Sequence, residues 1–352
     1  MKDDLVNYNL NKEALHIRVK QLIRMLINDT QPEYLASERE LQRQLGVSRT
    51  TVRKALNELV QEKRIVAEHG RGYRVIYAGK GRSLSGKIGF AMINSDDVFV
   101  NSVFRTMIDE VFSKKFEPVV TNIDLRYESP AEKISKLLAF TDGIIINSNI
   151  IRDGKDDFLP EGELYRCVAL PYPGRKIPLC SIMADMHSGA IMLTRHLLRQ
   201  GHRKIAVLSG DTDRVGGFRE AMAENGISIN EDIVCMCNGY RHSGFEQMGM
   251  LLERSQDFTA VVCQNDAAAL GAMEQCFLKG IKVPDEISIV GFDNIKDSER
   301  FPVPLTTAGI DLKIMCRKAL NLLLEGLRTG EKQQAIKLKP ELINRKSVMK
   351  LN

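Results

Sequence analysis

Residues 37–75 decide the fold of the N-terminal part, and they read SERELQRQLGVSRTTVRKALNELVQEKRIVAEHGRGYRV. Ser37 and Glu40 have the spacing of a capping box, in which the serine accepts from the amide of Glu40 and the glutamate reaches back. Gly46 stands where the chain must turn sharply with positive φ. Ser48 can cap the next helix, whose inner side carries Val52, Ala55, Leu56, Leu59 and Val60. Two short helices joined by a tight glycine turn predict a helix-turn-helix.

The flanking sequence predicts a preceding helix, which makes the helix after Ser48 the third, and a wing. Residues 12–28 place Leu15, Val19, Leu22, Ile23 and Leu26 on one helical face, and Asn28 to Pro32 end that helix. After Arg64 the apolar period changes from 3.6 to 2 around the tip His69-Gly70-Arg71-Gly72, which predicts a β-hairpin. Residues 78–86, AGKGRSLSG, are small and polar, as expected of a linker.

Positive charge is concentrated in this first part. Residues 1–82 hold 16 Lys and Arg against 10 Asp and Glu, a net charge of +6, whereas the rest holds 34 against 35. Charge alone leaves two interpretations open, a nucleic-acid-binding module or a solvated basic face. The helix-turn-helix pattern favours the first.

From Lys87 onward, short apolar strands alternate with amphipathic helices. We expect strands at 87–93, 117–123, 142–147, 166–170, 179–183, 204–209, 232–236, 259–264 and 286–292. We expect helices at 100–115, 130–139, 187–200, 216–225, 243–254, 267–279 and 311–327. Such alternation predicts an α/β fold with parallel sheets and helices on both faces. The length is generous for one sheet, so we expect two lobes with a cleft between them.

This pattern divides the chain into three parts. We expect a winged helix-turn-helix domain over 1–77, a linker over 78–86 and a two-lobed domain over 87–352. The chain is expected to cross between the lobes near 180–186 and 303–310.

The start of the third helix carries the candidate DNA contacts. Ser48, Arg49, Thr50 and Thr51 lie at the end that enters the major groove in helix-turn-helix proteins. Arg49 and Arg53 are one turn apart and share a face. An arginine can pair bidentately with guanine, which contributes about 1–3 kcal/mol of discrimination. The hydroxyls of Thr50 and Thr51 suit phosphates.

Three further residues extend this candidate interface. Arg39 can reach the same groove or a phosphate, and Gly70 lets the wing backbone approach the minor groove beside Arg71. The whole segment 37–75 resembles the GntR winged-helix module, since the capping box, the glycine turn, the Ser-Arg-Thr-Thr-Val-Arg entry and the HGRG wing occur in order. The resemblance implies the same roles for Arg39, Arg49, Arg53 and Gly70.

Candidate ligand contacts follow the expected strands of the second domain. Asp293 follows the apolar strand ISIVGF, and Asn265 follows AVVCQ. Arg214 lies in the loop after strand 204–209, at the start of a helix. Ligands of parallel sheets bind at the carboxyl ends of strands. A carboxylate there can accept hydrogen bonds from two vicinal hydroxyls, as a sugar requires. We expect the neighbouring Asp266 to cap a helix rather than to bind a ligand.

Residues 87–349 resemble the effector domain of the LacI/GalR family. The resemblance is carried by KIGF at 87–90, DGIII at 142–146, LLRQGHRKI at 197–205 and VPDEISIVGFDN at 283–294. It implies a two-lobed, periplasmic-binding-protein-like (type I) domain that dimerises and closes on a small ligand. That ligand is commonly a sugar and, in one branch, a purine. The resemblance implies ligand contacts at Arg214, Asn265 and Asp293. From the other lobe we expect Asn94, Asp96 and Phe99, in the loop after the first strand, and we expect Tyr240 to stack on a ring face.

The two parts together predict a cytoplasmic transcriptional repressor that a small molecule releases from DNA. The fusion resembles arabinose- and fucose-type regulators, so we expect a monosaccharide, either a pentose or a deoxyhexose. A purine or nucleoside, a sugar phosphate and an activating role stay open. Members of the family dimerise, so we expect a homodimer on a palindromic operator.

Other classes of protein are less well supported. The chain has no 18-residue apolar run and no secretory leader, so we expect no membrane partner. Its seven cysteines are expected to be reduced core thiols. The close pair Cys235 and Cys237 lacks partners for a zinc site. GntR modules are also fused to aminotransferase-like domains, but no phosphate loop, nucleophile elbow or metal helix occurs. We therefore expect no cofactor, no metal and no enzymatic activity.

Overall fold

The computed structural model describes residues 15–30, 32, 34–62, 64–68, 70–75, 84–93, 97–151, 161–171, 179–255 and 257–351. The chain forms two compact units that divide after Leu84, and each has its own hydrophobic core. In the described part, no helix is both long enough and apolar enough to cross a bilayer.

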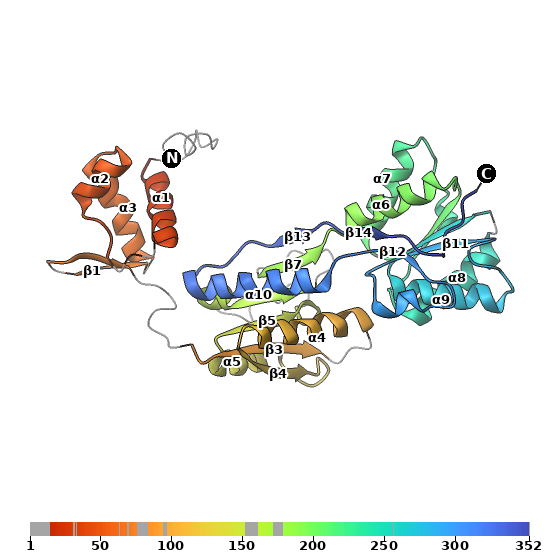
Figure 1. Cartoon of the computed structure of the whole chain (residues 1–352), viewed down its shortest axis with the longest axis horizontal. Coiled ribbons are helices and arrows are strands. Elements are labelled where there is room, and N and C mark those ends of the chain that lie inside the picture. The colour runs from red at the N-terminus through yellow and green to blue at the C-terminus, as the bar shows by residue number, and fades with distance from the viewer. Residues whose placement is uncertain are drawn as a thin grey trace. The chain divides into compact units, whose positions relative to one another are not determined.

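The smaller unit is a winged helix-turn-helix (Figure 1). Its elements are α1 (Leu15–Thr30), α2 (Glu38–Leu45), α3 (Arg49–Gln61), β1 (Ile65–Glu68) and β2 (Gly72–Val75). The two strands pair antiparallel. The core is filled by Val19, Ile23, Ile27, Leu35, Leu41, Val52, Ala55, Leu56, Leu59, Ile65 and Val75. Most of the apolar positions that predicted the helices and the hairpin bury against one another, and these elements are confirmed. Leu15 and Leu22 of α1 are exceptions, because both are exposed.

The turn between α2 and α3 has the predicted caps. Gly46 adopts φ +64°, and Ser48 Oγ accepts a hydrogen bond of 3.2 Å from the amide of Thr51. Ser37 Oγ accepts from the amide of Glu40 at 3.2 Å. The prediction that Glu40 reaches back is wrong, because its carboxylate accepts from the side chains of Arg43 and Gln44 instead.

The first lobe of the larger unit is built on a six-stranded, wholly parallel sheet in the order β13-β7-β6-β5-β3-β4. Its strands are β3 (Lys87–Ile93), β4 (Glu117–Ile123), β5 (Gly143–Asn147), β6 (Cys167–Leu170), β7 (Cys180–Ala184) and β13 (Ile336–Leu338). Its helices are α4 (Val98–Ser113), α5 (Pro130–Phe140) and α10 (Leu312–Thr329). Gly89 leaves room for Leu137 of α5 on one face, and Gly143 leaves room for Leu323 of α10 on the other.

The second lobe repeats this plan with the strand order β14-β12-β11-β10-β8-β9. Its strands are β8 (Ile205–Leu208), β9 (Val234–Cys235), β10 (Ala260–Cys263), β11 (Ser288–Phe292), β12 (Thr306–Gly309) and β14 (Glu341–Ile343). Its helices are α6 (Met186–Arg199), α7 (Thr212–Glu224), α8 (Arg241–Arg254) and α9 (Asp266–Leu278). Helices α6 and α7 pack together, as do α8 and α9, and the two pairs cover opposite faces. Only β14 runs antiparallel to its neighbour.

The chain passes three times between the lobes, after β7, between β12 and α10, and between β13 and β14 (Figure 1). The sequence did not indicate the third passage. Strands β13 and β14 have only three residues each and lie at sheet edges with partly exposed side chains, so they lack an apolar signature.

Three other elements differ from the predictions. Strand β9 spans only Val234–Cys235, because the 3-10 turn Glu231–Ile233 takes up its predicted start. Helix α7 begins at Thr212, four residues earlier than expected, because Asp211 caps it by accepting from the amide of Arg214 at 2.9 Å. Strand β12, with the sequence TTAG, is fully buried although it contains no large apolar residue.

Candidate DNA interface and effector site

The recognition helix α3 begins with a compact polar cap. Ser48 Oγ lies 2.8 Å from the Thr50 hydroxyl and 2.7 Å from the Thr51 hydroxyl, in addition to accepting from the Thr51 amide. The cap leaves unpaired amides of the first turn facing outward, which is the usual setting for a phosphate.

The two predicted recognition arginines lie together on the exposed side of α3. Arg49 and Arg53 both donate to the carboxylate of Glu38, the first residue of α2. The hydrogen bond from Arg53, together with that from Arg49, lowers the pKa of Glu38 below its usual value. Glu38 was not among the predicted site residues, although its capping-box position next to Arg39 placed it near the groove-facing surface.

The remaining DNA candidates are on the same unit. Arg39 is exposed on the first turn of α2. Gly70 has φ +79° at the hairpin tip, and Arg71 donates its amide to the carbonyl of Glu68 at 3.1 Å. The hairpin turn therefore uses the positive φ that only glycine adopts without strain.

In the larger unit, the centre of the predicted effector site is an arginine held between two carboxylates. Arg214 Nη1 lies 3.5 Å from Asp211 Oδ1, and Nη2 lies 3.9 Å from Asp293 Oδ1. The guanidinium stacks over the ring of Phe292, with 4.7 Å from Cζ to the ring centroid. Its Nε is buried and has no hydrogen-bond partner among the described residues. Arg214, expected after strand 204–209 at the start of a helix, lies on the first turn of α7.

Asp293 directly follows β11 with φ +104°, a conformation that side chains other than glycine rarely adopt. It is 8% exposed, and burial raises its pKa well above the usual value. Arg214 opposes this shift, whereas Asp266 and Asp97 add to it. Backbone strain and a buried carboxylate at the end of a central strand are features typical of ligand sites.

The other predicted contacts are less tightly gathered. Asn265 caps α9 by accepting from the amide of Ala268 at 2.9 Å. Tyr240 is half exposed and stacks on His242 at 5.6 Å between ring centroids. Phe99 packs against the hydrophobic core of the second lobe. Asn94 and Asp96 lie outside the described residues.

Two further polar residues lie at or just beyond the carboxyl ends of strands, and they were not predicted. Asp211 lies three residues after the end of the apolar strand β8, and that position could have marked it. Asn147 ends β5 of the first lobe; it is fully buried, and its Nδ2 has no partner among the described residues. It follows the strand GIII in the way that Asp293 follows its own strand.

The prediction that Asp266 caps a helix is wrong. Asn265 is the cap, and Asp266 is fully buried, accepting from the amide of Ile295 at 2.9 Å and from Thr307 Oγ1 at 2.5 Å. It fastens the loop after Asp293 to the helix α9.

His202 and the cysteines have structural positions. His202 lies between Thr259 Oγ1 and the carbonyl of Met349. All seven cysteines are buried, as predicted, and none forms a disulfide among the described residues.

A winged helix with an arginine-bearing recognition helix, joined to a two-lobed α/β domain, defines a DNA-binding transcriptional regulator with a separate sensor domain. Comparison with protein families agrees with this class. Residues 15–75 match the bacterial regulatory proteins of the gntR family, and residues 194–348 match a periplasmic binding protein-like domain.

Individual relatives are also regulators. The chain is 28% identical over 334 residues to the HTH-type transcriptional repressor PurR of Vibrio campbellii, covering 90% of this chain and all of that protein. It is 36% identical over 180 residues to PurR of Actinobacillus pleuropneumoniae serotype 3, covering 49% of this chain and 54% of that protein.

Solved structures share the fold of the larger unit. A LacI-family regulator of Sanguibacter keddieii superposes with a TM-score of 0.65 at 24% identity, covering 75% of this chain and 99% of that one. The Lac repressor dimer bound to operator and an anti-inducer superposes with a TM-score of 0.64 at 22% identity, covering 77% of this chain and 96% of that one. A LacI-family regulator of Enterococcus faecium with bound ribose superposes with a TM-score of 0.63 at 22% identity, covering 76% of this chain and all of that one. The chain thus joins a winged helix that matches the gntR family to a periplasmic binding protein-like domain, whose fold it shares with LacI-family regulators.

Proposed function

We propose that this chain is a transcriptional repressor that binds a palindromic operator as a homodimer and is released by a neutral monosaccharide. Arg39, Ser48, Arg49, Thr50, Thr51, Arg53, Gly70 and Arg71 would contact the DNA. The observation that carries the sensing part is the Arg214 guanidinium at the strand ends. It is buried, its Nε has no hydrogen-bond partner among the described residues, and its Nη atoms lie 3.5 and 3.9 Å from the carboxylates of Asp211 and Asp293. A buried cation so poorly paired is costly unless a ligand completes its hydrogen bonds.

Charge favours a neutral effector over a phosphorylated one. Arg214 faces Asp211 and Asp293, and the negative charge of Asp97 also acts on Asp293. Among the described residues, the acidic side chains around Arg214, with Asp266 as a further one, outnumber this cation and disfavour an added phosphate dianion. Carboxylate and guanidinium side by side suit the vicinal hydroxyls of a pentose or deoxyhexose, which donate to one group and accept from the other.

The relatives named as PurR repressors support a second candidate, a purine or nucleoside. Such a ligand needs a stacking partner for its ring. Phe292 is covered by Arg214, and Tyr240 stacks on His242, whereas Phe99 is partly buried against the second lobe. These positions favour the sugar.

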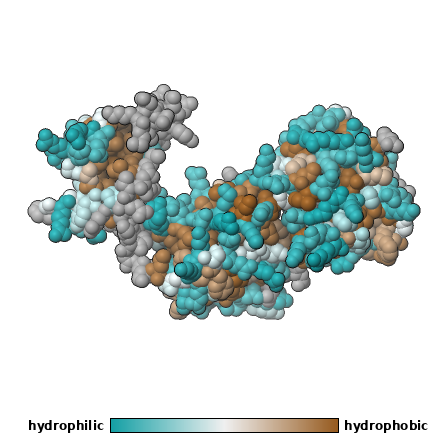
Figure 2. Space-filling view, viewed as in Figure 1, coloured by the Kyte–Doolittle hydropathy of each residue, from teal (hydrophilic) through white to brown (hydrophobic). Residues whose placement is uncertain are grey.

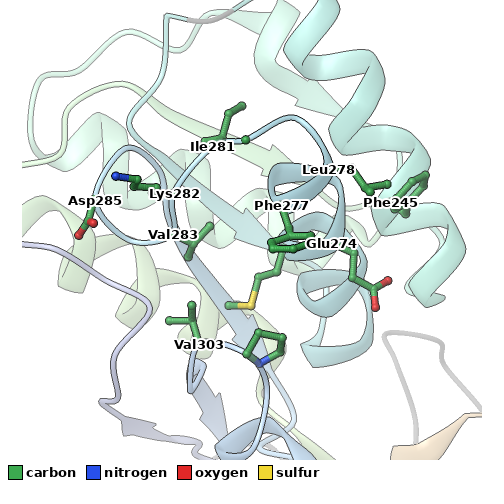
Figure 3. Close-up of a pocket in the computed structure, with 12 residues that line it drawn as sticks. Phe245, Glu274, Phe277, Leu278, Ile281, Lys282, Val283, Asp285 and Val303 are labelled. Carbon is green, nitrogen blue, oxygen red and sulfur yellow. The ribbon is translucent and has the colours of Figure 1, made fainter.

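The homodimer has a candidate contact surface on α9. Phe277 and Leu278 are 82% and 68% exposed. They adjoin a groove of about 880 Å³ lined by Phe245, Ile281, Val283 and Val303 (Figure 3). Apolar side chains also reach the surface elsewhere on the larger unit, between hydrophilic neighbours (Figure 2). A second copy is the expected occupant of the groove, because two winged helices are needed to read two half-sites.

A thermal-shift screen of the full chain tests the sensing proposal. The panel contains neutral pentoses and deoxyhexoses, their phosphates, and adenine, guanine and hypoxanthine. A ligand at 100 times its Kd stabilises by about 2.7 kcal/mol. We expect a neutral sugar to raise the melting temperature. If only sugar phosphates or only purines raised the melting temperature, that class of ligand would be the effector instead of a neutral sugar. If no ligand raised it, sensing of these molecules would be refuted.

Matched variants locate the binding site. Asp293→Asn and Arg214→Lys should abolish the shift produced by the sugar. Arg219→Lys is the control, because Arg219 is on the same helix but pairs with Glu231 on the surface. An unchanged shift in both site variants would place the ligand elsewhere.

A further inference from the structure

A single acidic side chain connects all three elements of the DNA-binding surface. Glu38 Oε2 accepts from Arg49 Nε at 3.0 Å and from Arg53 Nη2 at 2.9 Å, and Oε1 accepts from Arg53 Nε at 3.3 Å. The hydroxyl of Tyr73, from the wing strand β2, donates to Oε1 at 3.3 Å. One carboxylate thus links α2, the recognition helix and the wing.

Both arginines use the same edge of the guanidinium toward this carboxylate. Arg49 donates through Nε, and Arg53 donates through Nε and Nη2. A guanidinium has five N–H groups. One Nη–H from each Nη atom lies at the end of the side chain, away from the side that carries the Nε–H. Within the described part of the chain, neither arginine has a partner on that outer end. The side chains are 65% and 54% exposed, whereas that of Glu38 is 18% exposed.

This arrangement limits the freedom of two long side chains before DNA arrives. An arginine side chain that is free in solution otherwise loses its rotamer entropy only when DNA fixes it. The carboxylate also cancels one of the two positive charges at the front of α3. Cancelling a charge weakens sequence-independent attraction to phosphates, which is electrostatic.

We propose that Glu38 is a specificity-determining positioning residue: it holds Arg49 and Arg53 by their Nε edges so that the outer ends face the bases of the major groove. The inference rests on the proposed DNA-reading function. Removing the Glu38 charge should leave the arginines able to bind phosphates anywhere, while their orientation toward bases is lost.

The test compares Glu38→Gln with Glu40→Gln. Both changes remove one negative charge from the first turn of α2, but Glu40 binds Arg43 and Gln44 rather than the recognition arginines. The full-length wild type first selects duplexes from a random library. Anisotropy titrations then measure Kd for the selected duplex and for a scrambled duplex at several salt concentrations. Thermal unfolding of each variant checks that it is folded.

We expect both variants to bind the scrambled duplex more tightly than wild type, since both gain net positive charge. Only Glu38→Gln should also lower the ratio of selected to scrambled affinity by a further factor of about 10 or more, the size of one lost bidentate base contact. Tyr73→Phe, which removes only the supporting hydroxyl, should show a smaller loss in the same direction.

Equal ratios for Glu38→Gln and Glu40→Gln would overturn the positioning role while leaving DNA recognition intact. A wild type that selects no sequence at all would instead refute sequence-specific recognition itself, and the inference with it. The two failures are therefore distinguishable.

Discussion

Asp266 combines full burial with hydrogen bonds that favour its charged form. Burial raises its pKa from 3.8 to about 7, although Thr307 and the amide of Ile295 donate to it and oppose the shift. A carboxyl whose folded pKa exceeds its unfolded pKa binds more protons when folded. Between about pH 4 and pH 7 its contribution to stability therefore falls as pH rises.

We predict that the larger unit becomes more stable as pH is lowered from 8 to 5, and that Asp266→Asn flattens this dependence. Urea unfolding at each pH is the measurement. The pKa of Asp293 is raised as well. The informative quantity is therefore the difference in the free energy of unfolding between wild type and Asp266→Asn. If that difference were the same at pH 5 and pH 8, Asp266 would not be the titrating group.

At the scale of elements, α8 and α9 approach through two glycines. A methyl group on Gly271 would overlap the carbonyl oxygen of Arg241, and one on Gly244 would overlap that of Ala268. The obstacles are backbone atoms, which cannot move aside cheaply. These contacts hold the helix that begins at Asn265 against the helix that begins after Tyr240, so they also position two candidate effector residues.

We predict that Gly244→Ala and Gly271→Ala each destabilise the larger unit by about 1–3 kcal/mol, the usual cost of overpacking. Differential scanning calorimetry should show a lower melting temperature. Gly162→Ala is the control, because no atom lies within 4 Å of its added methyl group and its φ is not positive. If the melting temperature of Gly162→Ala fell as far as those of the two helix variants, the packing argument would be contradicted.

The proposed dimer belongs to the scale of the whole molecule. Phe277→Asp should convert a dimer to a monomer, because burying the new carboxylate against a second copy carries a large desolvation cost. Sedimentation velocity measures the change, and operator affinity should fall with it. Phe140→Asp, at another highly exposed phenylalanine on α5, is the control. A dimer that survives Phe277→Asp would place the interface on another surface.

Coupling between the two units is a second prediction at this scale. A sugar that weakens operator binding by a given factor must itself bind more weakly to the operator complex by the same factor, commonly about 5–150-fold. Calorimetry of sugar binding with and without operator DNA measures one side, and anisotropy with and without sugar measures the other. Tighter operator binding in the presence of sugar would make the protein an activator or a corepressor-dependent repressor.

Local patterns accounted for much of this molecule. The caps at Ser37, Gly46 and Ser48 depend on hydrogen bonds and φ angles within four residues, so residue spacing predicted them. Long apolar strands such as β3 and β5 were also predictable, because burial on both faces leaves a continuous apolar run. Strand β14, held by pairing with β12 rather than by apolar content, was not.

The sequence by itself determined the class of protein: the winged helix, the two-lobed α/β sensor and the residues at most strand ends follow from periodicity, caps and spacing, which act over a few residues. Only the tertiary structure decided which side chains work together. Glu38 contacts Arg49 and Arg53 across a turn. Asp266, the first residue of α9, accepts a hydrogen bond from Thr307, 41 positions away, instead of capping the helix. Such contacts depend on how segments distant in the sequence pack together, and local sequence patterns do not predict that packing.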